Sequence, residues 1–363
     1  MTELAEIFRQ HGPAYREKFG QGIPGSHLDA MRDIGRCRTA ALGGQVYACP
    51  DCQEVVYRYH SCRNRHCPKC QNGKAEEWLA AQQDLLLPVP YFMLTFTLPQ
   101  ELRALARSNQ GLFYNTLFQA SSAATKKLAA DARFIGGQIG MVGVLHTWGR
   151  DLCYHPHVHY LVPCGGLGRD GKTWLPGNPD FLLPVKALGK IFRAKFRTAV
   201  RKTDRFDQIP DTVWRQDWVV HAKPVGDGRI ALKYLAAYVF RVAISNRRIL
   251  KLENGQVTFR YKDTQTGKIK RCTLAAFEFI RRFLQHILPK GFVKVRYYGL
   301  FSPAWRARLS LLQQQLIALA LPTLDPDLDP SKTIPTDYHT VCCPTCGQIL
   351  EPQPLPKLRN RPP

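Results

Sequence analysis

The chain has 363 residues, of which 45% are hydrophobic and 22% charged, and these proportions are typical of a globular protein with a sizeable core. Lysine and arginine number 51 against 28 aspartate and glutamate residues, which gives a formal net charge of +23 at pH 7. Such a field attracts polyanions, so nucleic acid is the expected partner. No stretch approaches the roughly 20 apolar residues of a membrane span, and we therefore expect no membrane partner.

The first 20 residues carry charges every few positions and lack an apolar segment followed by a small-residue cleavage site. We therefore predict no secretory signal and a cytoplasmic protein that associates with the bacterial nucleoid. Twelve cysteines in such a protein favour metal ligation or buried thiols over disulfides, because cytosolic thiols are kept reduced.

Composition and hydrophobic pattern divide the chain into five segments. We predict an N-terminal helical segment, a zinc-binding DNA-recognition domain, a connecting helix, a large mixed domain, and a C-terminal part with a helix, a linker and a cysteine knuckle, at residues 1–36, 37–72, 73–90, 91–305 and 306–363. The overall class is α+β.

The cysteine-rich block has too few large apolar residues to fold unaided, so a metal is expected to hold it together. Two C-x2-C pairs, Cys49 with Cys52 and Cys67 with Cys70, are separated by the fourteen residues 53–66. This spacing is typical of four thiolates around one tetrahedral Zn²⁺.

Four further nitrogen and sulfur ligands lie in the same block, namely Cys37, His60, Cys62 and His66. They are enough to form a second zinc site, but they could also exchange into the first site or bind nothing. Basic residues among the ligands, Arg63, Arg65 and Lys69, suggest that the block grips the DNA backbone. The alternative is a purely structural zinc clamp.

After the connecting helix, which Pro88 stops, aromatic and β-branched residues predict a strand at 91–98 and a long helical region follows at 100–132. Residues 140–148 and 157–164 read as strands whose short connection makes them antiparallel neighbours, so the second of them is expected to be central. The remaining predicted elements are helices at 186–203, 230–242 and 274–288 and strands at 218–223 and 257–261.

The C-terminal part begins with an amphipathic helix at 309–321 and continues in a linker with Asp-Pro repeats at 322–337. Cys343 and Cys346 supply half a metal site, which His339 and Cys342 could complete. The proline-rich end after residue 352 is expected to be disordered.

Histidines alternate at 155, 157 and 159 within a β-type run, so their imidazoles should leave one face of one strand. We interpret His157 and His159 as ligands of Mg²⁺ or Mn²⁺, because an ion with few protein ligands keeps open positions for phosphate oxygens. His146 on the neighbouring strand is the nearest third ligand, and Asp151 is the alternative. The competing interpretation is that these histidines are structural core residues.

Tyr234 and Tyr238 are four residues apart in a helix-forming segment, so both phenols should share one helical face. A tyrosine phenolate can attack phosphorus and store the broken bond as an ester. Taken alone, the pair is more typical of two packing residues on an amphipathic helix than of nucleophiles. The basic residues that follow, Arg241, Arg247 and Arg248, favour DNA.

Taken together, these segments resemble the two-tyrosine HUH transposases of rolling-circle insertion sequences, the insertion sequence 91 family. The similar stretches occur in the order of that family and are Cys37-Arg38-Thr39, Ser61 to Cys70, Leu145-His146-Thr147-Trp148-Gly149, His155 to His159, Tyr234 to Tyr238, Arg241 to Asn246, Leu288 to Phe292 and Arg296 to Gly299.

The resemblance implies an HUH endonuclease fold, a central antiparallel sheet flanked by helices, with a zinc-binding domain in front. It implies that His157 and His159 hold the metal and that Tyr234 and Tyr238 alternate as nucleophiles. Members nick single-stranded DNA at the element end, keep a 5′-phosphotyrosine link and transfer the strand to target DNA. The chain has no glycine-rich phosphate-binding motif with lysine, so host replication or helicase proteins would unwind the duplex.

Two other functions compete with this interpretation. A plasmid replication initiator or relaxase would use the same metal and tyrosine chemistry, although the zinc block in front argues against it. A zinc-dependent DNA-binding regulator would carry the histidines and tyrosines as structural residues only.

Overall fold

The computed structural model describes residues 2–70, 78, 79, 82, 85–227, 230, 232, 239, 242–263, 266–320 and 341–355. Three of the predicted site residues, Tyr234, Tyr238 and Arg241, lie outside the described residues. The linker at 322–337, His339, half of the predicted connecting helix at 73–90 and most of the predicted helix at 230–242 lie outside them as well.

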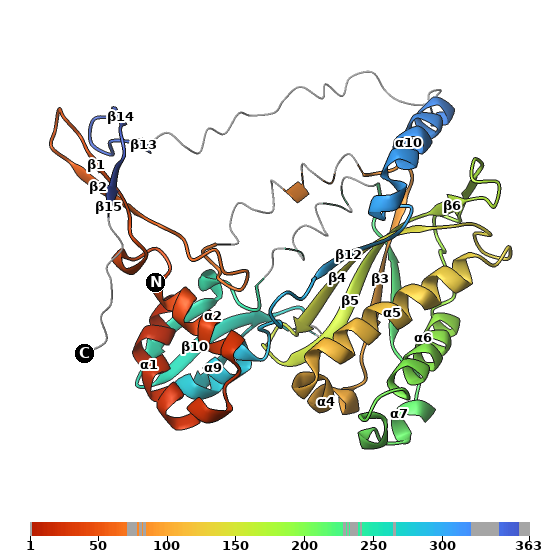
Figure 1. The fold of residues 1–363 in the computed structure, drawn as a ribbon, viewed down its shortest axis with the longest axis horizontal. Helices are drawn as coiled ribbons and strands as arrows, with labels where there is room; N and C mark the ends of the chain where they lie inside the picture. Colours follow the sequence, from red (N-terminus) through yellow and green to blue (C-terminus); the bar gives the residue numbers. More distant parts are fainter. Residues whose placement is uncertain are drawn as a thin grey trace.

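A five-stranded antiparallel sheet is the centre of the fold (Figure 1). The strands in order across the sheet are β12 (Val295–Gly299), β4 (Gly140–Trp148), β5 (Tyr154–Pro163), β3 (Tyr91–Thr97) and β8 (Val220–Pro224). The histidine-bearing strand β5 is the middle strand, as predicted. The central antiparallel sheet flanked by helices is therefore confirmed.

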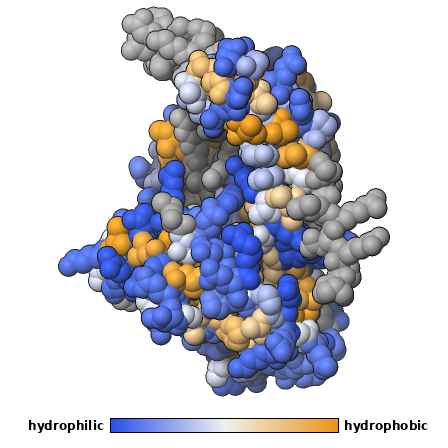
Figure 2. Space-filling model, turned by 90° about the vertical axis from the view of Figure 1, so that its left-hand side faces the viewer, coloured by the Kyte–Doolittle hydropathy of each residue, from blue (hydrophilic) through white to orange (hydrophobic). Residues whose placement is uncertain are grey.

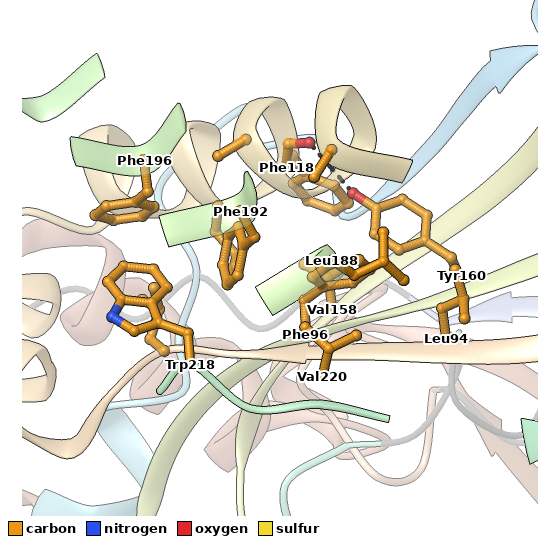
Figure 3. Packing of buried hydrophobic residues seen from close by; sticks show 14 of the residues in the cluster. Leu94, Phe96, Phe118, Val158, Tyr160, Leu188, Phe192, Phe196, Trp218 and Val220 are labelled. Atoms are coloured by element: carbon orange, nitrogen blue, oxygen red, sulfur yellow. Dashed lines mark hydrogen bonds between the residues drawn. The ribbon is translucent and has the colours of Figure 1, made fainter. Parts of the chain in front are cut away.

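Helices cover one face of this sheet, and Figure 1 shows them together on one side. They are α4 (Arg103–Ser108), α5 (Gln110–Ala129), α6 (Val185–Val200) and α7 (Thr212–Arg215). Phe96 and Tyr160 point from the strands into this layer, and Figure 3 shows them among Phe118, Leu188 and Phe192. The rings of Phe96 and Phe192 are 5.2 Å apart edge to face, and Tyr160 bonds Ser121 at 2.8 Å. The burial of these aromatic side chains stabilises the packing of the sheet against the helices.

The other face of the sheet has two halves. In one half, Met93, Val142 and Leu161 form an apolar cluster with helix α10 (Arg306–Ala320). Side chains alternate along a strand, so positions two or four residues away along the same strands also point to this face. These positions hold Thr95, His146, His157 and His159.

A second hydrophobic body contains elements far apart in the sequence. Helices α1 (Leu4–Phe19) and α2 (Gly25–Arg36) pack with helix α9 (Ala276–Leu284), and the rings of Phe8 and Phe283 are 5.6 Å apart. The sheet of this body consists of β9 (Ile249–Glu253), β10 (Gln256–Lys262) and β11 (Ile269–Ala275). Three cysteines, Cys37, Cys67 and Cys70, border the same core.

Short hairpins complete the fold. They comprise β1 (Gly44–Ala48) with β2 (Val55–Tyr59), β6 (Gly165–Leu167) with β7 (Trp174–Pro176), and β13 (Val341–Cys342) with β14 (Ile349–Leu350). Strand β15 (Gln353–Leu355) pairs with β1, and Gly44 lies opposite Leu355. The prediction that the chain is disordered after residue 352 is therefore wrong for these three residues, because β1 offers them a free edge to pair with.

The predicted long helix at 100–132 is broken at Asn109 into α4 and α5, because Asn109 adopts a non-helical backbone conformation (φ −129°, ψ 48°). The short 3-10 turns are η1 (Gly20–Gly22), η2 (Ala40–Leu42), η3 (Gln100–Leu102), η4 (Phe206–Gln208), η5 (Asn246–Arg248) and η6 (Pro303–Trp305). Among the described helices, none combines the length and the apolar character needed to cross a membrane.

Candidate metal centres and nucleic-acid interface

Three histidines converge on the face of the sheet opposite α5 and α6. His146 on β4 lies directly across from His157 on β5, and His159 follows two residues along the same strand. One ring nitrogen from each histidine lies within 4.8 Å of the others. The structure thus brings together the three residues that were expected to bind the metal, with His146 on the neighbouring strand as the sequence pattern suggested.

Hydrogen bonds orient two of these imidazoles. Nδ1 of His157 donates to the carbonyl oxygen of His155 at 2.6 Å, and Nδ1 of His159 lies 2.9 Å from Oγ1 of Thr95. A metal-bound histidine usually makes such a bond through its second ring nitrogen, which fixes the tautomer and leaves Nε2 to face the ion. The donor set therefore fits a divalent cation.

Burial keeps the cluster neutral. Burial lowers the pKa of His159 to about 4, with a smaller contribution from His155. Burial, followed by the charge of His159, lowers the pKa of His157 well below its usual range. Neutral imidazole is the form that binds a metal, so at neutral pH the site does not have to lose protons before binding.

The other two candidate positions have different roles. Asp151, the alternative third ligand, lies outside the histidine group and accepts a hydrogen bond from the backbone N–H of Cys153 at 3.2 Å. His155 points to the same face as His157, but its Nδ1 lies 2.6 Å from Nη2 of Arg103.

A pocket of about 600 Å³ opens beside the histidines. Its walls include four residues that the sequence pattern did not single out, namely Glu101, Arg103, Asp217 and His221. His221 on β8 lies opposite Thr95 on β3, so strand register places it on the histidine face. Glu101, Arg103 and Asp217 lie outside the strands, whereas His221 joins the site through the position of β8 in the sheet.

The cysteines form two groups, and the predicted single set of Cys49, Cys52, Cys67 and Cys70 is wrong. Cys67 and Cys70 join Cys37 and Cys62, with Sγ atoms all within 4.8 Å. Cys49 and Cys52 sit at the turn of the β1–β2 hairpin, and strand β2 then runs away from them for five residues, roughly 16 Å. The hairpin therefore separates the two C-x2-C pairs.

Cys49 and Cys52 instead meet Cys343 and Cys346 from the C-terminal end of the chain, again with all Sγ atoms within 4.8 Å. Cys342, expected to complete the C-terminal half-site, is exposed and lies outside this group. All twelve cysteines lie within the described residues, and each is a free thiol.

The two histidines of the cysteine block belong to neither group. Nε2 of His66 accepts a hydrogen bond from the backbone N–H of Leu288 at 3.3 Å, and burial lowers the pKa of His66 to about 3. His60 is exposed and its backbone groups pair with Gly43 and Arg38. Of the four residues that could have formed a second site, exchanged into the first or bound nothing, Cys37 and Cys62 thus join Cys67 and Cys70, and neither histidine takes part.

Two protein families and two named transposases are similar to this chain. Residues 7–98 match the family described as "Transposase zinc-binding domain", whose model is that of insertion sequence 91, and residues 140–308 match the family described as "Putative transposase". A protein of Sinorhizobium fredii named "Putative transposase y4qJ" is 38% identical over 93% of this chain and 88% of its own length. The chain belongs to the insertion sequence 91 family of transposases.

A second relative, the "Transposase for insertion sequence element IS801" of Pseudomonas savastanoi pv. phaseolicola, is 29% identical over 77% of this chain and 72% of its own length. No solved structure matches the chain significantly. The zinc-binding family model covers the whole first cysteine group, so this transposase binds Zn²⁺. DNA is its substrate.

The basic residues of the transposase fall into two classes. Arg65 donates to the carbonyl oxygens of Phe292 at 2.6 Å and Pro289 at 2.8 Å, and so ties the zinc block to the segment before β12. Lys69 forms a salt bridge with Glu3 at 2.6 Å. These two side chains are engaged in intramolecular contacts, which leaves the exposed Arg63 as the stronger candidate for DNA contact in this block.

Arg247 and Arg248 also differ in whether they are engaged in contacts within the protein. Arg248 donates to the carbonyl oxygens of Arg150 and of Arg260, the latter at 2.9 Å. Arg247 is exposed. Figure 2 shows the side of the transposase that bears the N-terminal helices and the hairpins, and hydrophilic residues predominate there between small hydrophobic patches.

Proposed function

We propose that this transposase cleaves and rejoins single-stranded DNA by the HUH mechanism, with Tyr234 and Tyr238 as nucleophiles and His146, His157 and His159 as ligands of Mg²⁺ or Mn²⁺. The observation that carries the proposal is the convergence of three neutral imidazoles beside an open pocket. When bound there, the cation would act as a Lewis acid on the scissile phosphate and stabilise charge on its oxygens.

Described residues on either side of the tyrosines support their assignment. Leu232 and Val239 pack in the apolar cluster on the same face of the sheet as the histidines. Nζ of Lys294 donates to the carbonyl oxygen of Val239 at 3.0 Å and lies 5.2 Å from the ring centre of Trp148. Trp148 stacks on His146 at 4.7 Å. Leu232 and Val239, which flank the two tyrosines in the sequence, thus lie on the same face of the sheet as the histidine cluster, and this supports the proposal.

In the proposed reaction, one phosphoester bond forms for each one that breaks. The tyrosine hydroxyl gives its proton to solvent or a nearby base, and the resulting phenolate attacks phosphorus. The bond from phosphorus to the 3′ oxygen breaks, and that oxygen takes up a proton. The products are a 5′-phosphotyrosine ester and a free 3′-OH. Attack by a 3′-OH on that ester reverses the step, so rejoining needs no ATP, and two tyrosines allow two such links in one rolling-circle transposition event.

The zinc block would recognise the ends of the element, with Arg63 on the phosphate backbone. The central sheet would then act on a strand that host helicase or replication proteins have separated. Arg65 lies beside the first cysteine group and donates hydrogen bonds to the carbonyl oxygens of Pro289 and Phe292. These bonds would hold the recognition surface and the cleavage surface in a fixed relation.

A covalent-adduct assay tests this function. The transposase is incubated with single-stranded DNA of an element terminus and Mn²⁺, and a slow-migrating adduct is sought on a denaturing gel. Each single variant, Tyr234→Phe or Tyr238→Phe, should retain some adduct, and the double variant should form none. Tyr261→Phe, in a strand of the second hydrophobic body, is the matched control and should react normally.

Adducts in the double Phe variant would overturn the assignment of the nucleophiles. A protein that binds the terminus but gives no adduct with any divalent cation would be a DNA-binding regulator instead.

A further inference from the structure

We propose that Cys49, Cys52, Cys343 and Cys346 hold a second structural Zn²⁺, which fastens the C-terminal end of the chain to the β1–β2 hairpin. The matched zinc-binding family ends at residue 98, so two of these four ligands come from outside it. This site is independent of the cleavage chemistry.

The sulfur positions suit a tetrahedral ion. Sγ of Cys49 lies 3.5 Å from Sγ of Cys346, and Sγ of Cys52 lies 3.3 Å from Sγ of Cys343 and 3.8 Å from that of Cys346. Four thiolates at the usual Zn–S distance of about 2.3 Å would stand about 3.8 Å apart. The group is thus close to the size of a Cys₄ zinc site.

The two halves of the group repeat one backbone geometry. The N–H of Gln53 donates to the carbonyl oxygen of Cys49 at 3.0 Å, and the N–H of Gly347 donates to that of Cys343 at 2.9 Å. The N–H of Cys49 donates to Glu54 at 2.9 Å, and that of Cys343 donates to Gln348 at 2.8 Å.

The residue after the second cysteine has a positive φ in both halves, 58° at Gln53 and 79° at Gly347. Each C-x2-C pair therefore forms the turn of its own hairpin, β1–β2 and β13–β14. Two hairpins that face each other through such turns are typical of a zinc ribbon.

Little else stabilises this part of the molecule. Its core consists of Tyr47, Val341 and Leu350 around the cysteines, with Val56 packed beside them. Strands β13 and β14 have two residues each, and β15 adds three residue pairs to β1. A core of this size does not offset the entropy of ordering the chain, whereas zinc binding does.

The position of the site has a structural consequence. Figure 1 shows β13, β14 and β15 beside β1 and β2, remote from the central sheet. The β2 strand displays Tyr57, which is exposed, stacked on Tyr59 with ring centres 6.1 Å apart. Zinc held by the C-terminal cysteines would therefore rigidify this exposed hairpin, while the Cys37 group keeps its own ion at the core of the second hydrophobic body.

Zinc counting on the full chain tests the proposal. Native mass spectrometry and elemental analysis should find two zinc ions per chain in the wild type. The double variant Cys343→Ser, Cys346→Ser should hold one. Cys342→Ser, a neighbouring exposed thiol outside the group, is the matched control and should hold two.

Hydrogen exchange supplies a readout that does not depend on stoichiometry. In the double serine variant, exchange of residues 44–59 should increase at least tenfold, while the central sheet keeps its protection. A single zinc in the wild type, two zincs in the double variant, or a disulfide between Cys52 and Cys343 in protein prepared under reducing conditions would each overturn the proposal. None of these outcomes depends on whether the transposase cleaves DNA.

Discussion

His146 lies directly opposite His157 on the neighbouring strand, with ring centres 5.5 Å apart. A register shift between His146 and Trp148 then allows the indole to stack on the His146 ring at 4.7 Å. The proposed metal ligands thus sit on paired strands in the middle of the sheet, where backbone hydrogen bonds fix their spacing.

Replacing His146 with alanine should therefore weaken metal binding as strongly as replacing His157. We expect each change to reduce Mn²⁺ affinity at least tenfold and to suppress metal-dependent nicking, because a divalent ion would retain two imidazoles instead of three. Titration calorimetry with Mn²⁺ measures the affinity, and the oligonucleotide assay measures nicking.

His155→Gln is the control for this prediction. His155 points to the same face but contacts Arg103, so the variant should bind Mn²⁺ within about threefold of the wild type. Equal affinity in the His146 variant and the wild type would contradict the three-histidine site.

Arg65 and Arg63 should respond to alanine substitution in opposite ways. Arg65→Ala removes two charged hydrogen bonds to Phe292 and Pro289 from a partly exposed side chain, so we expect a loss of about 1–3 kcal/mol of stability. Arg63→Ala should leave the urea midpoint unchanged but weaken DNA binding and reduce its salt dependence. An Arg63 variant with lowered stability and normal DNA affinity would refute this division.

The histidine site could be predicted from the sequence because its geometry is local. Alternation along one strand places His157 and His159 on one face, and the short connection from 149 to 153 forces β4 to pair with β5, which brings in His146. Thr95 and His221 could not be anticipated, because they join the site only through the order of β3 and β8 in the sheet.

The cysteines show the limit of spacing arguments. Two C-x2-C pairs fourteen residues apart fit one zinc site by count, but the intervening segment forms a strand instead of a loop. Cys70 instead meets Cys37, which lies 33 residues earlier, and Cys52 meets Cys343, which lies 291 residues later. Local spacing carries no information on such pairings, just as connectivity among many cysteines cannot be deduced from sequence.

His286 should make the stability of the protein sensitive to acid. It is 1% exposed, its Nε2 lies 3.2 Å from the carbonyl oxygen of Leu152, and burial lowers its pKa from 6.5 to about 4. Between these two values the unfolded chain binds more protons than the folded one, so stability falls as the pH falls through this window.

The contribution of this histidine is on the order of 3 kcal/mol, since one pKa unit corresponds to about 1.4 kcal/mol. Urea unfolding of the wild type and of His286→Gln at pH 7 and pH 4.5 measures it. The wild type should lose about 2–3 kcal/mol more than the variant on acidification. Parallel losses would show that His286 is not kept neutral by burial.

Replacing Lys294 with an apolar residue should raise the stability of the protein and lower its nicking activity. Its Nζ donates to the carbonyl oxygen of Val239 and lies over the ring of Trp148, and burial, followed by the charge of Arg65, lowers its pKa to about 7. The pKa in the unfolded chain is near 10.5, so the folded protein binds fewer protons between pH 7 and 10.5 and its stability rises with pH in that window.

Lys294→Met should therefore be about 1–2 kcal/mol more stable than the wild type at pH 6 and should lose the rise above pH 7. The same variant should nick DNA about 10- to 100-fold more slowly, because the contact to Val239 that we propose to position the tyrosine segment is gone. Lys294→Arg, which keeps the charge and a donor, should recover part of the rate. Thermal unfolding across pH and the nicking assay measure both effects, and a methionine variant with a wild-type nicking rate would show that Lys294 does not position the nucleophiles.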